Sequence, residues 1–132
     1  MKNPPTALLV SPSDLLLELL QDSLELIGIK SAIADGWGQA SSLLESKEKP
    51  KVIFTDSILL DGTCIDVLRL SAKAAGDVPV IVVWPGDNYD LYLDAMEAGA
   101  ADFLTPPFTS ADVAWVLCSV MQNRVPPRLQ VA

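Results

Sequence analysis

The residue best placed for chemistry is Asp56, which ends the apolar run Val52-Ile53-Phe54-Thr55 and is followed by Asp61-Gly62. A short apolar run of this kind is typical of a buried strand. In an open parallel sheet, ligands and reacting groups collect just beyond the carboxyl ends of the strands. Asp56 is therefore a candidate functional carboxylate, and its surroundings decide whether it can react.

Missing residue types exclude several chemistries. The chain has no His among its 132 residues, which excludes Ser–His and Cys–His nucleophilic pairs, His-ligated zinc and a phosphohistidine. Cys64 and Cys118 lie far apart and lack metal-ligand spacing. We expect both thiols to be buried apolar residues and not a disulfide.

Composition limits the size of the fold and the kind of partner. A chain of 132 residues, half of them apolar, forms one domain and leaves no room for a second. The net charge of -8 argues against non-specific binding of nucleic acid, and the one basic cluster, Lys47, Lys49 and Lys51, includes Glu48. The sequence has no apolar stretch of membrane-spanning length and no signal peptide, so we expect no membrane contact and a cytoplasmic location.

Strand and helix patterns alternate along the chain. We expect strands at residues 7–10, 29–34, 52–55, 80–84 and 102–105. Helices are expected at residues 12–27, 38–46, about 64–75, 89–98 and 110 to about 123. Five strands, each followed by a helix, predict an α/β fold, a doubly wound parallel sheet with helices on both faces.

Caps and apolar spacing define the first helix most clearly. Ser11 is the expected N-cap, Pro12 the first helical residue, and Asp14 part of the first turn. Gly28 is the expected stop. The residues that recur at helical spacing, and that we expect to face the core, are Leu15, Leu16, Leu19, Leu20, Leu24 and Ile27.

Two segments carry a family resemblance. The first is Asp56 with Asp61-Gly62, and the second is residues 97–108, which read E-A-G-A-A-D-F-L-T-P-P-F. With the order of elements, they resemble a two-component response-regulator receiver domain over about residues 6–124. The resemblance implies a single (βα)5, flavodoxin-like or CheY-like domain. Residues 125–132 would be a tail or the start of a linker, so the chain would be a stand-alone receiver or part of a longer regulator.

The resemblance also assigns a role to Asp56, and four further positions depart from the family pattern. In the family, the Asp that ends strand 3 accepts a phosphoryl group from a histidine kinase with Mg2+ bound, so Asp56 stands at the phosphoacceptor position. Ser11 and Pro12 stand where receivers have a pair of acids. Trp84 replaces a Ser or Thr, and Pro106 replaces a Lys. Mg2+ needs carboxylate oxygens, and Pro has neither a donor nor a charge, so we expect no cofactor, and Mg2+ only if the site still works.

Three of these residues also have purely structural interpretations. Asp56 can be an acid that caps its own loop, and Trp84 can be an aromatic residue of the core or its rim. Pro107 occupies a family position where the preceding peptide bond is typically cis, so we predict a cis Pro106–Pro107 bond.

Aromatic residues near the end of the chain form a candidate contact surface. Tyr89, Tyr92 and Met96 belong to the fourth expected helix and Trp115 to the fifth. Receivers commonly use the face of helix 4, strand 5 and helix 5 for dimers or partners. The alternative is that Tyr89 and Tyr92 only cover the edge of the sheet.

Three functions from different classes follow. The first is a pseudo-receiver, a non-enzymatic signalling module of a phosphorelay that binds a protein partner, such as a histidine kinase or an output domain. The second is a working phosphoacceptor in which Asp14 or a backbone carbonyl helps to hold Mg2+. The third, a small enzyme or cofactor binder, is disfavoured because residues 11–13 are not Gly-rich and the chain lacks the His expected of a cobalamin-binding domain.

Overall fold

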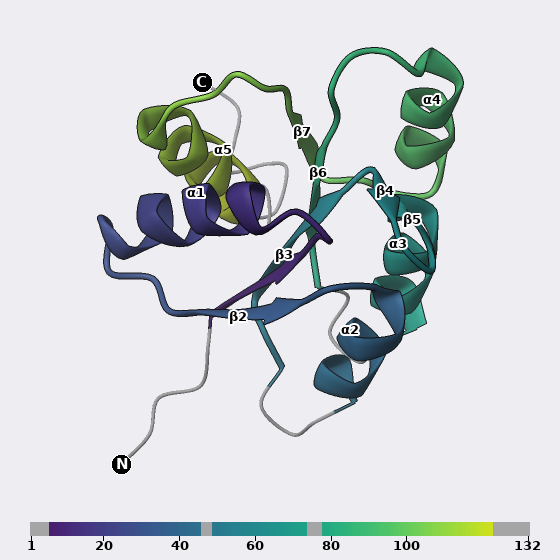
Figure 1. The fold of residues 1–132 in the computed structure, drawn as a ribbon, viewed down its shortest axis with the longest axis horizontal. Coiled ribbons are helices and arrows are strands. Elements are labelled where there is room, and N and C mark those ends of the chain that lie inside the picture. The colour runs from purple at the N-terminus through teal and green to yellow at the C-terminus, as the bar shows by residue number, and fades with distance from the viewer. Residues whose placement is uncertain (1–5, 46–48, 74–77, 123–132) are drawn as a thin grey trace.

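The computed structural model describes residues 6–45, 49–73 and 78–122. Its centre is a parallel five-stranded sheet in the order β2-β1-β3-β6-β7 (Figure 1). The strands are β1 (Ala7–Val10), β2 (Ser31–Ala34), β3 (Val52–Asp56), β6 (Val80–Val83) and β7 (Asp102–Leu104). The helices are α1 (Asp14–Glu25), α2 (Trp37–Leu44), α3 (Cys64–Lys73), α4 (Tyr89–Glu97) and α5 (Ser110–Gln122). The predicted doubly wound α/β fold is confirmed.

Strands β1 and β6 are apolar throughout, and β3 is apolar from Val52 to Phe54, because helices cover both faces of the sheet. Leu9 of β1 and Phe54 of β3 lie in the core under α1 and α5. Their neighbours Leu8 and Ile53 lie in the second core, under α2, α3 and α4. Alternate residues of one strand thus serve two layers, and the carboxyl ends of the strands are left as the open edge of the sheet.

The first helix begins later than predicted. Its N-cap is Ser13, whose Oγ accepts a hydrogen bond from the Leu16 amide at 3.2 Å. Ser11 is not the cap and Pro12 is not helical, because the Ser11 hydroxyl is engaged elsewhere, with Asp56 and the Ser13 amide. Gly28 ends the helical segment as expected, with a φ of 75° that suits glycine.

The apolar face of α1 was predicted only in part. Leu20 and Leu24 are buried as expected, and so is Leu17, which was not expected. Leu15 is 79% exposed, Leu19 38% and Ile27 44%, so for these three residues the prediction was wrong.

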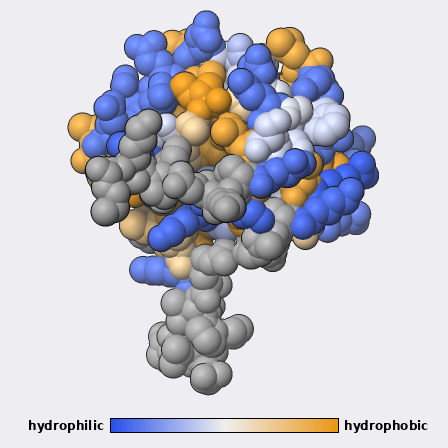
Figure 2. All heavy atoms as spheres, turned by 90° about the horizontal axis from the view of Figure 1, so that it is seen from below, coloured by the Kyte–Doolittle hydropathy of each residue, from blue (hydrophilic) through white to orange (hydrophobic). Residues whose placement is uncertain are grey.

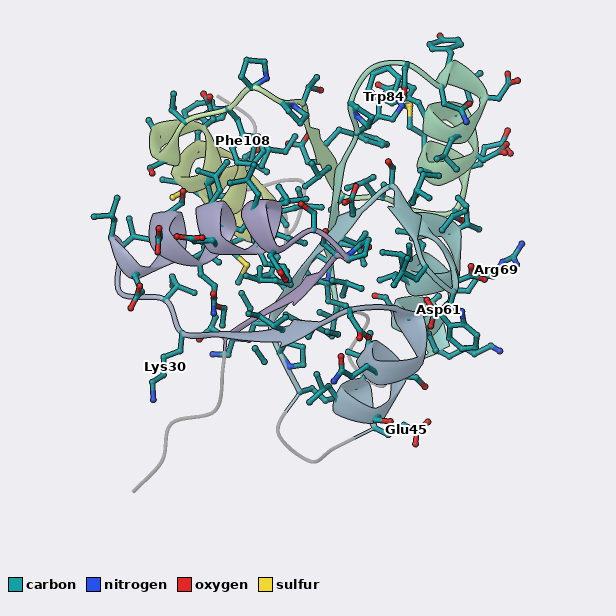
Figure 3. The ribbon with its side chains drawn as sticks, in the orientation of Figure 1. Lys30, Glu45, Asp61, Arg69, Trp84 and Phe108 are labelled. Atoms are coloured by element: carbon teal, nitrogen blue, oxygen red, sulfur yellow. The ribbon has the colours of Figure 1, made fainter. Side chains whose placement is uncertain are left out.

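A small hairpin that the sequence did not reveal follows β3. Strands β4 (Ile58–Leu59) and β5 (Gly62–Thr63) pair antiparallel. Between them, Asp61 caps α2 from a distant part of the chain: its Oδ1 accepts from the Trp37 amide at 3.0 Å and its Oδ2 from the Gly38 amide at 3.1 Å. The Trp37 indole donates in turn to the Asp61 carbonyl at 2.6 Å. Figure 3 places Asp61 beside α2 accordingly.

The last helix starts as predicted. The Thr109 amide donates to Asp112 Oδ2 at 2.8 Å, and the Asp112 amide donates to Thr109 Oγ1 at 3.2 Å. This reciprocal pair is a capping box. The predicted ends of helices 2, 3 and 5 at residues 46, 75 and 123, the tail at 125–132, and Lys47 and Glu48 of the basic cluster lie outside the described residues.

The two cysteines differ in burial. Cys64 is buried at the start of α3, as expected, whereas Cys118 is exposed on α5, contrary to expectation. Both thiols are free. Polar residues cover much of the described surface in Figure 2, and hydrophobic residues interrupt it in several places. Among the described helices, none is long and apolar enough to cross a membrane.

Candidate functional site

Asp56 is the last residue of β3 and lies half-buried at the carboxyl edge of the sheet, opposite Val83 of β6. The protein's own donors hold both oxygens of its carboxylate. The Ser57 amide donates to Oδ1 at 2.8 Å, and the Ser11 hydroxyl donates to Oδ2 at 3.0 Å. Ser11 Oγ accepts in turn from the Ser13 amide at 2.9 Å. Asp56 thus ties the β1–α1 loop to the end of β3.

The two positions after β1 supply no carboxylate to this site. Ser11 is almost fully buried, and Pro12 is exposed. Asp14, the nearest acid in sequence, is an exposed residue in the first turn of α1. Within residues 6–45, 49–73 and 78–122, no group of three or more His, Cys, Asp or Glu side chains is placed to hold a metal ion.

Trp84 lies just after β6, and its side chain engages α4. The indole Nε1 donates to the Asn88 carbonyl at 3.0 Å. The ring lies 4.8 Å from that of Tyr92, which lies 4.4 Å from that of Phe103 on β7. In Figure 3, Trp84 lies on the α4 side of the sheet, whereas Phe108 lies near α1 and α5. These contacts favour the interpretation of Trp84 as an aromatic residue at the rim of the core.

A cavity of about 340 Å³ opens beside Asp56. Its lining is almost entirely apolar: Leu15, Leu16, Leu19, Val83, Pro85, Pro106, Pro107 and Phe108, with Ser13 and Asp56 as the polar members. The Pro106–Pro107 peptide bond is cis, as the sequence predicts. Among the described residues, no Lys or Arg lines the cavity, and its three prolines have no backbone N–H to offer a ligand.

Cys64 lies near Asp56, and its thiol stays protonated because its pKa is raised. Burial, with smaller contributions from Asp56 and Asp66, raises the Cys64 pKa to about 11. The thiolate is the nucleophilic form of cysteine, so Cys64 does not serve this site as a nucleophile.

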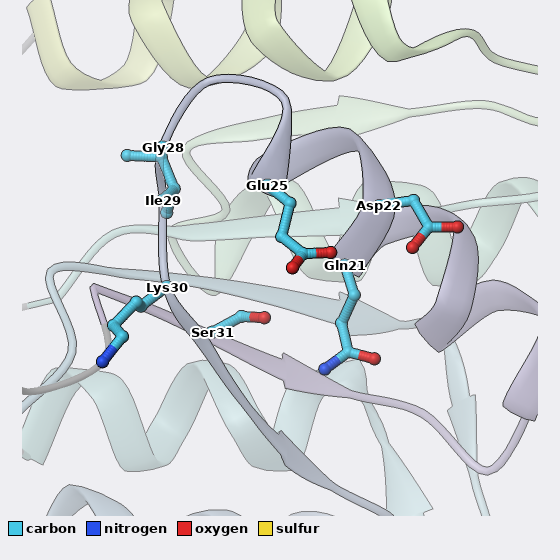
Figure 4. Close-up of a pocket in the computed structure, with 7 residues that line it drawn as sticks. All are labelled: Gln21, Asp22, Glu25, Gly28, Ile29, Lys30 and Ser31. Carbon is cyan, nitrogen blue, oxygen red and sulfur yellow. The ribbon is translucent and has the colours of Figure 1, made fainter.

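A larger hollow lies elsewhere, between the last turns of α1 and the start of β2 (Figure 4). Its volume is about 530 Å³. Figure 4 shows Asp22 and Glu25 extending from α1, with Lys30 on the adjoining segment. None of the predicted site residues lines it.

The expected contact surface is only partly exposed. Tyr89, Met96 and Trp115 are 64%, 51% and 75% exposed, respectively. Tyr92 is half-buried between Trp84 and Phe103, with Tyr89 stacked on it at 5.9 Å. Tyr92 therefore covers the edge of the sheet, whereas Tyr89, Met96 and Trp115 are exposed and available for contact with a partner.

Among the residues around the site, sequence reasoning placed Asp56 but missed the apolar cavity. Leu15, Leu16 and Leu19 line this cavity, although their helical spacing predicts that they face the core. One signal was available, because leucines at 15, 16, 17, 19 and 20 exceed what a single buried stripe needs.

Comparison with known proteins gives sequence relatives among bacterial regulators. No family model matches the chain. The chain is 32% identical over 105 residues to the C4-dicarboxylate transport transcriptional regulatory protein DctD of Pseudomonas aeruginosa, covering 78% of this chain and 22% of that protein. It is 25% identical over 123 residues to the phosphate regulon transcriptional regulatory protein PhoB of the same species, covering 92% and 53%. The chain thus spans about a fifth to about a half of these relatives.

Solved structures show the same architecture. A CheY-like response regulator receiver domain protein from Methanospirillum hungatei JF-1 aligns with a TM-score of 0.81 at 19% identity, covering 94% of this chain and all of that one. The non-phosphorylated receiver domain of HemR from Leptospira biflexa aligns with a TM-score of 0.76 at 26% identity, covering 89% and 94%.

Proposed function

Because this chain is a receiver (CheY-like) domain of the response-regulator type in fold and sequence, we propose that it is a non-enzymatic signalling module that acts by contact with a protein partner. In this proposal, Mg2+-dependent phosphorylation of Asp56 is impaired or absent. The observation that carries the proposal is the cavity beside Asp56, whose walls are apolar and include no Lys or Arg from the residues that the structure describes.

The chemistry of phosphoryl transfer explains why such a cavity works against the reaction. Catalysis of this reaction is positioning together with neutralisation of charge on the transferred group. Mg2+ is bound through carboxylates, waters and phosphate oxygens. Within the described part of the chain, Asp56 is the only carboxylate that lines the cavity. At Pro106 the cavity has neither the positive charge nor the donor that a Lys would supply.

The positions of Ser11 and Trp84 support the same proposal. Ser11 uses its hydroxyl to hold Asp56 and the β1–α1 loop, so Asp56 has a structural role without any phosphate. Trp84 donates a hydrogen bond to Asn88 and packs against Tyr92. Because tryptophan has no hydroxyl, position 84 offers none to bond a phosphoryl oxygen.

We place the partner contact on α4 and α5. Tyr89 and Met96 of α4 and Trp115 of α5 present exposed apolar area on either side of β7, the edge strand. Exposed apolar groups of this size are common at protein interfaces. The partner would be a histidine kinase, an output domain or a second copy of this chain.

A second function is favoured by one observation. Asp56 keeps a carboxylate that lines an open cavity. In this alternative, Asp56 is a working phosphoacceptor for a histidine kinase, and Asp14 or a backbone carbonyl helps to hold Mg2+.

Incubation with acetyl phosphate and MgCl2, followed by intact-mass measurement, separates the two functions. The proposal predicts no phosphoryl adduct on the folded protein. The control is Asp56→Asn, which keeps the shape of the side chain. A stoichiometric adduct that disappears in Asp56→Asn would refute the proposal and establish the alternative.

A further inference from the structure

We propose that the cavity beside Asp56 binds a small organic cation, an alkyl or cycloalkyl ammonium. Its hydrocarbon body would lie against Leu16, Pro106 and Phe108, and its ammonium group would donate to Asp56. The inference goes beyond the signalling role, and it does not depend on whether Asp56 is ever phosphorylated.

The apolar walls of the cavity favour a ligand with an apolar body. Leu15 and Leu19 at its rim are exposed, and so are Pro85, Pro106 and Pro107. Of the ten described residues that line the cavity, eight are apolar. Exposed apolar side chains gathered around a concavity gain free energy when a ligand covers them.

The carboxylate of Asp56 favours a ligand that carries a positive charge. Asp56 is the only charged residue among the described residues that line the cavity. Each oxygen of a carboxylate has two acceptor positions. Asp56 Oδ1 accepts a hydrogen bond from the Ser57 amide, and Oδ2 accepts one from the Ser11 hydroxyl. The carboxylate therefore retains acceptor capacity toward a ligand. A ligand that covered the Asp56 carboxylate without donating a hydrogen bond would leave its negative charge desolvated and unpaired. An ammonium group would instead pair with that charge.

The surrounding segments have the complementary charge for a cation. Residues 11–29 and 102–122, which include α1 and α5, contain no Lys or Arg. The same segments carry acidic residues, among them Asp14 and Glu18 of α1 and Asp112 of α5, all exposed. A cleft surrounded by charge of one sign concentrates the opposite ion.

Size and donor set decide which cation fits. A volume of about 340 Å³ is at the lower end of the range for small-molecule pockets, about 300–1,000 Å³. A divalent metal ion would need several oxygen ligands, which leucine and proline walls do not offer. An amine with a compact hydrocarbon ring uses both the walls and the carboxylate.

Three probes of matched shape test the inference. Cyclohexylmethylamine, cyclohexylmethanol and cyclohexanecarboxylate differ chiefly in their polar group. We expect the amine to bind with a Kd of about 1 mM, shifting the amide resonances of Ser13, Leu16, Ser57 and Phe108 in a 1H–15N titration. The alcohol should bind about fivefold more weakly or worse, and the carboxylate should not bind.

Two variants identify the group that the amine recognises. Asp56→Asn should weaken amine binding about fivefold, to the level of the alcohol. Glu18→Gln removes one exposed charge from the same helix and should change the Kd less than about twofold. Circular dichroism establishes that both variants are folded.

Four outcomes would overturn the inference: no saturable shift with the amine, equal binding of amine and alcohol, amine binding that survives Asp56→Asn, and shifts confined to the hollow of Figure 4. The last outcome matters because Asp22 and Glu25 make that hollow the competing site for a cation.

Discussion

Removing the carboxylate of Asp61 tests whether the β4–β5 hairpin and α2 are joined as the structure shows. Asp61→Ala removes the acceptor for the Trp37 and Gly38 amides, which are bonded at 3.0 and 3.1 Å. The N-cap of α2 is Gly36, which makes no side-chain bond of its own. The first turn of α2 therefore depends on an acid 23 to 24 residues away.

The expected loss follows from these two bonds. Loss of a side-chain N-cap costs about 0.5–2 kcal/mol, and loss of a negative charge near a helix N-terminus costs about 0.3–1 kcal/mol when the site is exposed. Asp61 is exposed, so we expect the lower part of the combined range, about 1–1.5 kcal/mol.

A substitution at Gly36, the N-cap of α2, tests the same contact between Asp61 and α2. A Cβ at Gly36 would lie 2.4 Å from Asp61 Oδ1, too close to be tolerated, so Gly36→Ala must displace the Asp61 carboxylate. The backbone itself accepts alanine, because the φ of Gly36 is -163°. Each single variant should therefore lose about the same free energy of unfolding, and the double variant little more than either one.

Urea denaturation followed by tryptophan fluorescence measures all three variants. Asp87→Ala, in the exposed loop before α4, is the matched control and should change the free energy of unfolding by less than about 0.5 kcal/mol. Additive losses in the double variant, or a loss for Asp61→Ala no larger than for the control, would refute the proposed link between the hairpin and α2.

Further predictions concern the thiols and Trp84. With the Cys64 pKa raised to about 11, only about one Cys64 thiol in a thousand is ionised at about pH 8. A thiol reagent should then label exposed Cys118 quickly and Cys64 only after unfolding; equal labelling rates in the folded protein would contradict this. Trp84→Phe keeps a ring beside Tyr92 but loses the bond to Asn88, so urea denaturation should show a loss of about 1 kcal/mol. An unchanged stability would mean that this bond contributes nothing.

The sequence predicted the sheet well because its strands are covered on both faces. Continuous apolar runs such as those of β1 and β6 leave little doubt about strand positions. The residues that depart from the receiver pattern were also identified from sequence, because each is defined by its distance from a strand end. The hairpin escaped prediction since strands of two residues have no detectable periodicity.

Other features depend on contacts between distant parts of the chain. Ser11 and Ser13 are both acceptable N-caps, and only the bond from Ser11 to Asp56, 45 residues away, decides between them. The leucines of α1 and the apolar residues of α5 surround much of each helix. Local pattern therefore could not show that Leu15 would line a cavity or that Cys118 would be exposed.

The central claim is that the groups around Asp56, and not Asp56 itself, prevent Mg2+-dependent phosphorylation. Its most direct test compares the initial rates of labelling by acetyl phosphate and MgCl2 for the natural chain and for a variant that carries Ser11→Asp, Pro12→Asp, Trp84→Thr and Pro106→Lys, with each also measured as Asp56→Asn. We predict an Asp56-dependent adduct on the folded variant and none on the natural chain. Labelling of the natural chain at a rate equal to the variant's would contradict the account.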